Sequence, residues 1–390
     1  MKPYPGVDFF KISHLLSDDE RSVQAMVRQF TERSFLPLIK EHHAAGTFPV
    51  ELIPELGELG LLGPSVKGPG CGGLSYTIYG LICEELERGD SGLRSFASVQ
   101  GSLVMWPISV YGTEEQRAKF LPELAAGRMV GCFGLTEAGH GSDPGGMETR
   151  CTRDGDQWVI TGNKMWITSA TMADVALVWA RDTDDNKVRG FLLEKGDSGF
   201  SSQAIHGKFS LRASDTGELV MDEVRVPDSR RLPGVEGLKG PLSCLNEARY
   251  GIAWGVVGAA ADAYDVALQY SLEREQFDVP IASFQLTQAK LADMVTEITK
   301  GQLMALQLGR LKDSGVNEFP LVSMAKRNNV AMALDVCRTA RSILGAAGIT
   351  DEYSPGRHMN NLESVITYEG THEIHTLVVG QAVTGIAAYR

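Results

Sequence analysis

Residues 158–193 read WVITGNKMWITSATMADVALVWARDTDDNKVRGFLL, and this stretch decides the fold class. It contains short apolar runs of strand length, at residues 158–160, 175–179 and 191–193. Turn-forming Asp, Gly and Asn residues flank these runs, so hairpin loops are predicted at Gly155-Asp156 and at residues 182–186. We therefore expect a β domain, which extends over residues 130–236.

The sequence on both sides of this section has helical periodicity. Ser17-Asp18-Asp19-Glu20 and Thr113-Glu114-Glu115-Gln116 are capping boxes, which mark helix starts. Helices are predicted at about residues 17–40, 76–86, 93–111, 241–271, 283–312, 319–344 and 372–388. The order predicts an α+β fold with a helical domain over 1–129, the β domain over 130–236 and a C-terminal four-helix bundle over 237–390.

Composition and charge narrow the classes of function. The net charge of −12 is unsuited to a phosphate polymer, so nucleic acid is not an expected partner. No run approaches the roughly 18 apolar residues that cross a bilayer, and MKPYPGVDFF lacks the apolar stretch of a signal peptide. The six cysteines form no Cys-x-x-Cys pair and are expected to be reduced. A cytoplasmic location follows, or the mitochondrial matrix in a eukaryote.

Several common catalytic signatures are missing. The chain has no Gly-x-Ser-x-Gly elbow and no Walker loop. Gly139-His140-Gly141, followed by Gly145, has one residue too many for a dinucleotide fingerprint. His372 and His375 lie one helical turn apart, but no further cysteine or carboxylate cluster supports a metal site, and none is expected.

Three other segments carry chemistry-bearing residues. Phe133-Gly134-Leu135-Thr136-Glu137 leaves a strand-like run and leads into a loop of small residues around Ser142. Residues 164–169 place Trp166 two residues before Thr168, and residues 367–371 place Glu369 at a glycine turn before the last helix. Taken singly, the first segment could equally be a simple turn, the second a core strand and the third an exposed helix cap.

Together the three segments resemble the acyl-CoA dehydrogenase family, from about Ser17 to Ala388. The resemblance implies FAD as the cofactor and an acyl-CoA as the substrate. The β domain would then line one face of the flavin through Trp166, Ile167 and Thr168. The pyrimidine end of the flavin would be held by backbone groups at Phe133, Leu135 and Thr136, and Ser142 would meet the phosphates or the acyl-CoA.

The resemblance also implies that a neighbouring subunit completes the cofactor site. Arg274 and Phe277, together with Gln285, match the stretch that reaches the FAD of a second subunit, and a guanidinium is a permanent donor for a pyrophosphate. Gly345-Ala346-Ala347-Gly348 would approach the adenine half through Gly345 and Gly348. Thr371 and Glu373 would be further FAD contacts. A homotetramer is expected, with electron-transferring flavoprotein as the electron acceptor.

Glu369 would be the catalytic base. By resemblance it removes the α-proton of the acyl-CoA while the β-hydride passes to flavin N5. Desolvation raises the pKa of a carboxylate and so makes it a stronger base. Gly370 would allow the thioester to come close, and the Glu369 N–H and a flavin ribityl hydroxyl would polarise the thioester carbonyl. Some family members carry the base at the position of Ala248, beside Glu247.

A narrower set of segments resembles glutaryl-CoA dehydrogenase: residues 87–95, 98–100, 207–214 and 244–251. In that subfamily the residue matching Arg94 binds the distal carboxylate, which needs a paired cation when buried. Glu87 would orient Arg94, and the alternative is a surface Arg94 paired with Asp90. The remaining substrate contacts would come from Ser95, Ser98, Asn246, Arg249 and Tyr368. Gly101 and Trp106 depart from the subfamily pattern.

The expected reaction is dehydrogenation of glutaryl-CoA and decarboxylation to crotonyl-CoA and CO2, a step of lysine and tryptophan degradation. The Tyr at position 368 is the one that decarboxylating members keep. The alternatives are a dehydrogenase that does not decarboxylate and one that acts on another short acyl-CoA. A catalytically silent protein with the flavin fold is a third alternative, and the presence of Glu369 with Trp166 and Thr168 argues against it.

Overall fold

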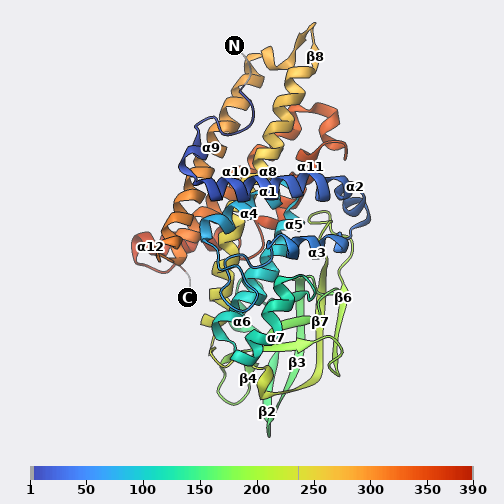
Figure 1. The fold of residues 1–390 in the computed structure, drawn as a ribbon, viewed down its shortest axis with the longest axis vertical. Coiled ribbons are helices and arrows are strands. Elements are labelled where there is room, and N and C mark those ends of the chain that lie inside the picture. Colours follow the sequence, from blue (N-terminus) through green and yellow to red (C-terminus); the bar gives the residue numbers. More distant parts are fainter. Residues whose placement is uncertain (1–3, 236, 389–390) are drawn as a thin grey trace.

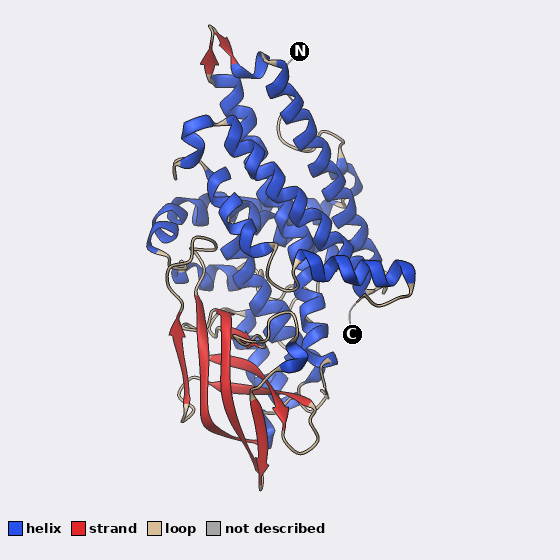
Figure 2. Ribbon diagram, turned by 180° about the vertical axis from the view of Figure 1, so that it is seen from behind, coloured by secondary structure: helices blue, strands red, loops and turns tan. Residues whose placement is uncertain are grey.

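The computed structural model describes residues 4–235 and 237–388. The structure does not describe residues 1–3, 236 and 389–390. The outer bounds of the predicted domains and the boundary at residue 236 therefore lie outside the described residues. The predicted α+β class is confirmed, because helices precede and follow one section of strands (Figure 1). The sheet forms one end of an elongated molecule and the long helices form the other (Figure 2).

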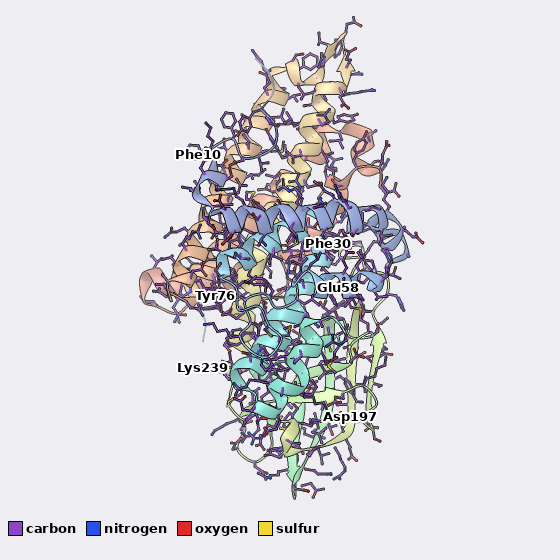
Figure 3. The ribbon with its side chains drawn as sticks, viewed as in Figure 1. Phe10, Phe30, Glu58, Tyr76, Asp197 and Lys239 are labelled. Atoms are coloured by element: carbon purple, nitrogen blue, oxygen red, sulfur yellow. The ribbon has the colours of Figure 1, made fainter. Side chains whose placement is uncertain are left out.

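The N-terminal helices begin where the capping boxes predicted. The Ser17 hydroxyl accepts from the Glu20 N–H, and the Thr113 hydroxyl accepts from the Gln116 N–H. Figure 3 shows Phe30, the buried last residue of the first α-helix, and Phe10, which is exposed. The helices are α1 Asp18–Phe30, α2 Leu36–Ala45, α3 Ile53–Glu58, α4 Tyr76–Gly89, α5 Ser91–Ser98, α6 Trp106–Tyr111 and α7 Glu114–Ala125.

Two π-helical segments interrupt the predicted N-terminal helices, at Thr31–Phe35 and Val99–Met105. Within the second, the Gln100 amide donates to the Leu124 and Met129 carbonyls and accepts from the Gly131 N–H at 2.8 Å. Gly101 faces Gly63, and a Cβ at position 101 would lie 2.9 Å from the Gly63 Cα. The departure at position 101 is therefore a packing requirement of this chain, since a side chain has no space there.

The β domain is a seven-stranded sheet of order β1-β4-β2-β3-β7-β6, with β5 paired to β4. Both predicted hairpin loops are present: Asp154 pairs with Gln157 across Gly155-Asp156, and β4 pairs antiparallel with β5 across residues 183–187. β1 and β2 run parallel to β4. The strands are β1 Gly131–Gly134, β2 Arg150–Asp154, β3 Gln157–Thr168, β4 Val175–Asp182, β5 Val188–Glu194, β6 Phe200–Ala204 and β7 Thr216–Pro227.

The C-terminal helices are α8 Lys239–Glu273, α9 Gln285–Asp313, α10 Phe319–Ile343, α11 Ser354–Val365 and α12 His372–Thr384. The prediction that the last helix continues to residue 388 is wrong. Gly385 adopts a φ of 72° and its N–H bonds to the Gln381 carbonyl, which ends the helix. α8 is the central helix and lies very close to α4, because a Cβ on Gly258 would be 1.8 Å from the Glu84 carbonyl oxygen.

The loop between β6 and β7 joins the sheet to the helices. The Leu211 N–H donates to Asn361 Oδ1 at 2.9 Å, and the hydroxyls of Ser210 and Ser364 are 2.6 Å apart, so this loop packs on α11. A Cβ on Gly92 of α5 would lie 2.4 Å from the Ala213 carbonyl oxygen of the same loop. The loop thereby brings the end of β3 close to α5 and α11. Among the described helices, none is both long and apolar enough to span a bilayer.

Candidate active site

Glu369 lies on the turn between α11 and α12. Its φ is 51° and that of Gly370 is 91°, so both residues are left-handed. For a residue with a side chain this conformation costs about 1–2 kcal/mol. Position 370 has no space for a larger residue, because a Cβ there would lie 2.8 Å from His375 Nε2. The Thr371 hydroxyl then caps α12 by accepting from the Ile374 N–H.

Donors from three helices bind the backbone of this turn. Lys326 of α10 donates from Nζ to the Tyr368 carbonyl at 2.5 Å and to the Gly370 carbonyl at 2.6 Å. Arg249 of α8 donates from Nε to the Glu369 carbonyl at 2.6 Å. His375 Nε2 lies 3.2 Å from the same oxygen and carries the proton there, because a carbonyl can only accept. The turn is therefore held at three consecutive carbonyls.

The Glu369 carboxyl is suited to act as a base. Its Oε2 atom is buried and has no hydrogen-bond partner among the described residues. Burial raises the pKa of Glu369, while the cationic groups of Arg94, Lys326 and Arg249 act in the opposite direction. An ionised carboxylate without its own hydrogen-bond donors retains its basicity.

Arg94 is one of the three cations that act on this carboxyl. Its Nε lies 2.6 Å from Glu87 Oε2, and its Nη2 bonds to the Tyr368 hydroxyl. Its Nη1 is buried without a partner among the described residues, so one donor is free to bind a ligand. The alternative of a surface pair with Asp90 is wrong, because Asp90 binds Arg357 and Asn361 instead.

Gly255, which was not predicted as a site residue, leaves space for the pair of Glu87 and Arg94. A Cβ on Gly255 of α8 would lie 2.1 Å from Glu87 Oε2 and 3.1 Å from Arg94 Nε. Its signal in the sequence is a helix that carries Gly251, Gly255 and Gly258 at helical spacing on one side, which favours close approach of a neighbouring helix.

The other predicted substrate residues lie around the Arg94 pair and along α8. Ser95 and Ser98 are buried on α5, and Ser98 Oγ has no partner in the described parts of the chain. Asn246 donates to Asn317 Oδ1 at 3.1 Å, and its own Oδ1 is likewise buried without a described partner. These unpaired atoms are available for hydrogen bonds to a ligand.

Glu247, which adjoins the alternative position for the base, is already paired. Lys312 Nζ donates to Glu247 Oε1 at 2.7 Å, and both side chains are buried. Ala248 is packed within the apolar core. Of Glu247 and Glu369, only Glu369 has no salt bridge to another described residue.

Trp166 gives the β domain an exposed aromatic face. It has a φ of 64° at a register shift of β3, and 55% of its surface is exposed although it lies between buried Lys164 and Ile167. Thr168 is half-buried and pairs with Thr216 at the foot of the loop that packs on α11. A planar ring can stack on such a face, so the residues fit the flavin that the resemblance implies.

Lys164 ties the loop after β1 to this strand. Its Nζ donates to the Leu135 carbonyl at 3.0 Å and to Glu137 Oε1 at 2.8 Å. The Met165 N–H donates to the Thr136 carbonyl at 2.9 Å. The side chains of Phe133 and Ile167 point into apolar clusters, so only their backbone groups remain for a cofactor.

A second group of predicted cofactor residues is not brought together with the first. Arg274 follows the end of α8, about 35–40 Å along the helix from Arg249. Phe277 is 89% exposed at the tip of the hairpin formed by β8 Glu275–Gln276 and β9 Val279–Pro280, which lies at the end of the molecule remote from the sheet (Figure 1). Gln285 begins α9 beside this hairpin.

Gly345 and Gly348 also lie away from Glu369, in the turn Gly345–Ile349 that follows α10. The distance along α10 from Lys326 is about 25–30 Å. Gly345 has a φ of 61°, and a Cβ on Gly348 would lie 2.2 Å from the Arg341 carbonyl oxygen. Within one chain these residues cannot contact the same flavin ring as Trp166.

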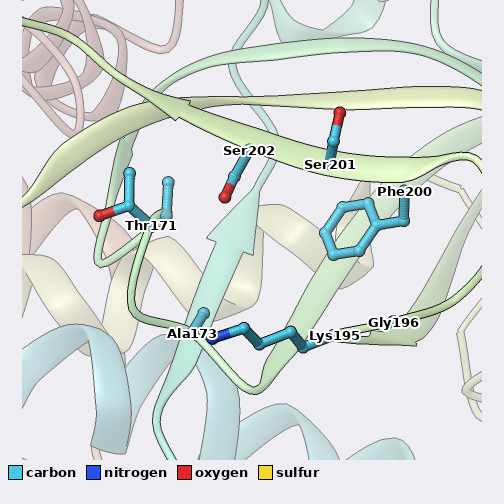
Figure 4. Close-up of a pocket in the computed structure, with 8 residues that line it drawn as sticks. Thr171, Ala173, Lys195, Gly196, Phe200, Ser201 and Ser202 are labelled. Carbon is cyan, nitrogen blue, oxygen red and sulfur yellow. The ribbon is translucent and has the colours of Figure 1, made fainter.

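Two cavities in the described part of the chain differ in their relation to the site. One of about 480 Å³ is lined by Thr371 and Glu373, together with Ala331, Ile366, Thr367 and His372, and it places two predicted cofactor residues at an open volume. The other, of about 190 Å³, lies against β6 and is lined by Thr171, Lys195 and Phe200 among others (Figure 4). No predicted site residue lines it. Ser142 is exposed in the loop before Pro144.

The fold thus combines a buried, unpaired carboxyl oxygen of Glu369 in its helical part with an exposed Trp166 on its β domain. Comparison with protein families gives three matches, described as the N-terminal, middle and C-terminal domains of acyl-CoA dehydrogenase, at residues 17–128, 132–224 and 236–384. The chain belongs to the acyl-CoA dehydrogenase family.

Individual relatives cover nearly the whole chain. A crystal structure of glutaryl-CoA dehydrogenase from Mycobacterium smegmatis has 54% identity and a TM-score of 0.97, covering 99% of this chain and 100% of that one. A second, of glutaryl-CoA dehydrogenase from the same organism in complex with FADH2, has 52% identity, a TM-score of 0.98 and full coverage of both chains. A probable acyl-CoA dehydrogenase of Bacillus subtilis, YngJ, is 36% identical over 374 residues, 94% of this chain and 98% of that protein.

Proposed function

We propose that this protein is an FAD-dependent glutaryl-CoA dehydrogenase that also decarboxylates its product. The observation that supports the substrate is the buried Arg94, which has one free Nη1 donor and bonds to the hydroxyl of the residue next to Glu369. The 54% sequence identity to glutaryl-CoA dehydrogenase of M. smegmatis supports the same substrate.

Arg94 binds the distal carboxylate of the substrate. A carboxylate in this pocket loses its hydration, and a guanidinium with a free N–H replaces the lost hydrogen bonds. Arg94 bonds to the hydroxyl of Tyr368, the residue that precedes the base Glu369, so the proposed carboxylate clamp lies close to the base. A short dicarboxylic acyl chain can therefore reach from Glu369 to Arg94, while its thioester remains near the turn.

Glu369 removes the α-proton. The left-handed backbone at positions 369 and 370 leaves the Glu369 N–H outside a helix, where it donates to the thioester carbonyl and stabilises the developing enolate. Trp166, Thr168 and the backbone at Leu135 and Thr136 hold the flavin. Bound FAD supplies the acceptor for the β-hydride. The buried position of the Glu369 carboxyl excludes water from the proton transfer.

In this proposal the same residues also serve the decarboxylation. When CO2 leaves the enoyl product, the electron pair of the broken carbon–carbon bond moves into the dienolate of the thioester. Glu369, which now carries the α-proton, returns it to the γ-carbon and crotonyl-CoA is formed. Tyr368, whose hydroxyl binds Arg94, places a neutral polar group beside the departing carboxylate.

A neighbouring subunit completes the cofactor site. This part of the proposal is supported by the exposed hairpin that carries Phe277 and by its separation from Trp166 within one chain. A homotetramer supplies such a neighbour. The reduced flavin needs an oxidant, and electron-transferring flavoprotein is the acceptor that the family resemblance implies.

A substrate panel tests the proposed function. Purified protein is mixed anaerobically with glutaryl-CoA, butyryl-CoA and isovaleryl-CoA, and flavin bleaching is followed at each concentration. We expect the fastest flavin reduction with glutaryl-CoA, together with one CO2 and one crotonyl-CoA for each flavin reduced. Accumulation of glutaconyl-CoA without CO2 would identify a dehydrogenase that does not decarboxylate, and preference for butyryl-CoA would remove the glutaryl assignment.

A further inference from the structure

Lys326 is a buried lysine that the catalytic steps above do not use. It lies in the first third of α10 and only 1% of its surface is exposed. Its neighbours in sequence, Arg327 and Asn328, are exposed, so the helix turns this one cationic side chain inward. The ammonium forms no salt bridge within the described residues and instead bonds to two backbone carbonyls.

We propose that Lys326 is a positioning residue, which holds the Tyr368–Gly370 turn in the left-handed conformation that directs the Glu369 carboxyl at the substrate. The proposal rests on the proposed function, since it concerns the base of that reaction. It assigns to Lys326 no contact with the substrate or the cofactor.

The geometry supports this role because the two carbonyls lie on either side of Glu369. Nζ is 2.5 Å from the Tyr368 oxygen and 2.6 Å from the Gly370 oxygen, and these oxygens can meet at one ammonium only if the residue between them keeps its backbone conformation. Lysine suits the position because its ammonium presents several donors at one point. Arg249 and His375 bind the intervening carbonyl of Glu369 from other helices.

The charged groups around Lys326 give the proposal an electrostatic consequence. Among the described residues, the titratable and charged groups around it include Glu369 and Tyr368 on the turn, Arg94 of α5, Arg249 of α8 and His375 of α12. Burial lowers the pKa of Lys326 to about 7, and Glu369 opposes this shift. Removal of the side chain therefore takes a positive charge from the Glu369 carboxylate and moves the pKa of the base upward.

The experiment compares Lys326→Met, Lys326→Gln and Lys326→Arg in the FAD-loaded enzyme. Amide hydrogen exchange of peptides that cover residues 364–375 reports the rigidity of the turn without any turnover. Stopped-flow flavin reduction by glutaryl-CoA at several pH values reports the base. Leu56→Ala, which opens the distant N-terminal core, is the control for general loss of stability.

We expect Lys326→Met to exchange the 364–375 amides faster and to reduce its flavin about 100-fold more slowly, as a base displaced by about 1 Å does. KM should change little, because no substrate contact is lost. The acid limb of the rate profile should move to higher pH. Lys326→Gln should show the same changes more weakly, and Lys326→Arg should recover part of the rate. Leu56→Ala should lower the thermal midpoint without any of these effects.

Wild-type exchange of the 364–375 amides and a wild-type pH profile in both Lys326→Met and Lys326→Gln would overturn the proposal. If Lys326→Met does not fold, the same two measurements on Lys326→Gln decide. Failure of the wild-type enzyme to oxidise glutaryl-CoA would instead disprove the proposed function, and the exchange data would still test how the turn is held.

Discussion

Arg94 Nε lies 2.6 Å from Glu87 Oε2, and neither side chain exposes any surface to solvent. A fully buried ion pair is seldom a net source of stability, because desolvation of two charges offsets their attraction. Gly255, which has no side chain, leaves the space that the pair occupies. The arrangement fixes the direction of the guanidinium and leaves its Nη1 nitrogen without a partner among the described residues.

The Arg94→Ala variant should lose activity selectively with glutaryl-CoA. Truncation of a buried, charged hydrogen-bond partner costs about 2–5 kcal/mol, so kcat/KM for glutaryl-CoA should fall by roughly 30- to 5,000-fold. Butyryl-CoA and isovaleryl-CoA, which have no distal carboxylate, should be affected far less. Steady-state kinetics on the three substrates provide the measurement.

A double variant separates binding from stability at this position. Arg94→Ala alone leaves the Glu87 carboxylate buried and unpaired, which destabilises the fold. Glu87→Gln with Arg94→Ala removes that charge and should restore part of the thermal stability without restoring glutaryl-CoA selectivity. An equal loss on all three substrates would show that Arg94 is not the clamp.

The Glu369→Gln variant should bind FAD and fail to reduce it. In the wild type the ionised carboxylate is the active form, and burial places its pKa above the usual value. The rate of flavin reduction should therefore rise with pH through this raised pKa and level off above it. Flavin content and anaerobic bleaching are measured together, and flavin reduction at an ordinary rate by the variant would disprove the assigned base.

The Gly258→Ala variant should strongly destabilise the contact between α4 and α8. The new Cβ would lie 1.8 Å from the Glu84 carbonyl oxygen, which cannot move without distorting α4. Overpacking of this kind costs about 3 kcal/mol, which should lower the thermal midpoint by roughly 4 °C in a chain of 390 residues. Gly380→Ala in α12 is the matched control, because nothing lies within 4 Å of its Cβ, and it should be neutral or slightly stabilising.

The Phe277→Asp variant should lose assembly and cofactor together. Phe277 and Leu286 are among the most exposed apolar side chains described, and they lie on and beside the hairpin that is expected to reach a neighbouring subunit. Light scattering should show smaller assemblies, and the ratio of flavin to protein should fall in parallel. Phe10→Asp alters an exposed aromatic residue elsewhere and should retain both; a fully loaded monomer of Phe277→Asp would refute the shared site.

Local signals in the sequence were sufficient for most of the fold. The two capping boxes and the turn at Gly155-Asp156 depend on neighbouring residues, so their patterns are visible without tertiary information. The π-helical segment Val99–Met105 is different. It accompanies hydrogen bonds from Gln100 to residues about 25–30 positions away, and no local pattern records such partners.

Some residues of the candidate site could likewise be predicted from the sequence, and others could not. Glu369, Arg94 and Trp166 stand in motifs that a resemblance can recognise, and the pairing of Glu87 with Arg94 was anticipated. Lys326 was missed because a lysine in an amphipathic helix usually faces solvent, and because its partners are backbone carbonyls, which have no residue type. His375 was considered only as a metal ligand, although it contacts the Glu369 carbonyl.

Helix α8 carries Arg249, which binds the Glu369 turn, near its beginning and Arg274 just past its end. In the proposed assembly the two ends of α8 contribute to different active sites. Arg249 contributes to the site of its own subunit and Arg274 to the site of a neighbouring subunit. A mutation at Arg274 would then leave the active site of its own subunit intact and inactivate the site of the neighbouring subunit. Two inactive proteins, altered at opposite ends, would regain function when mixed, as complementing alleles do.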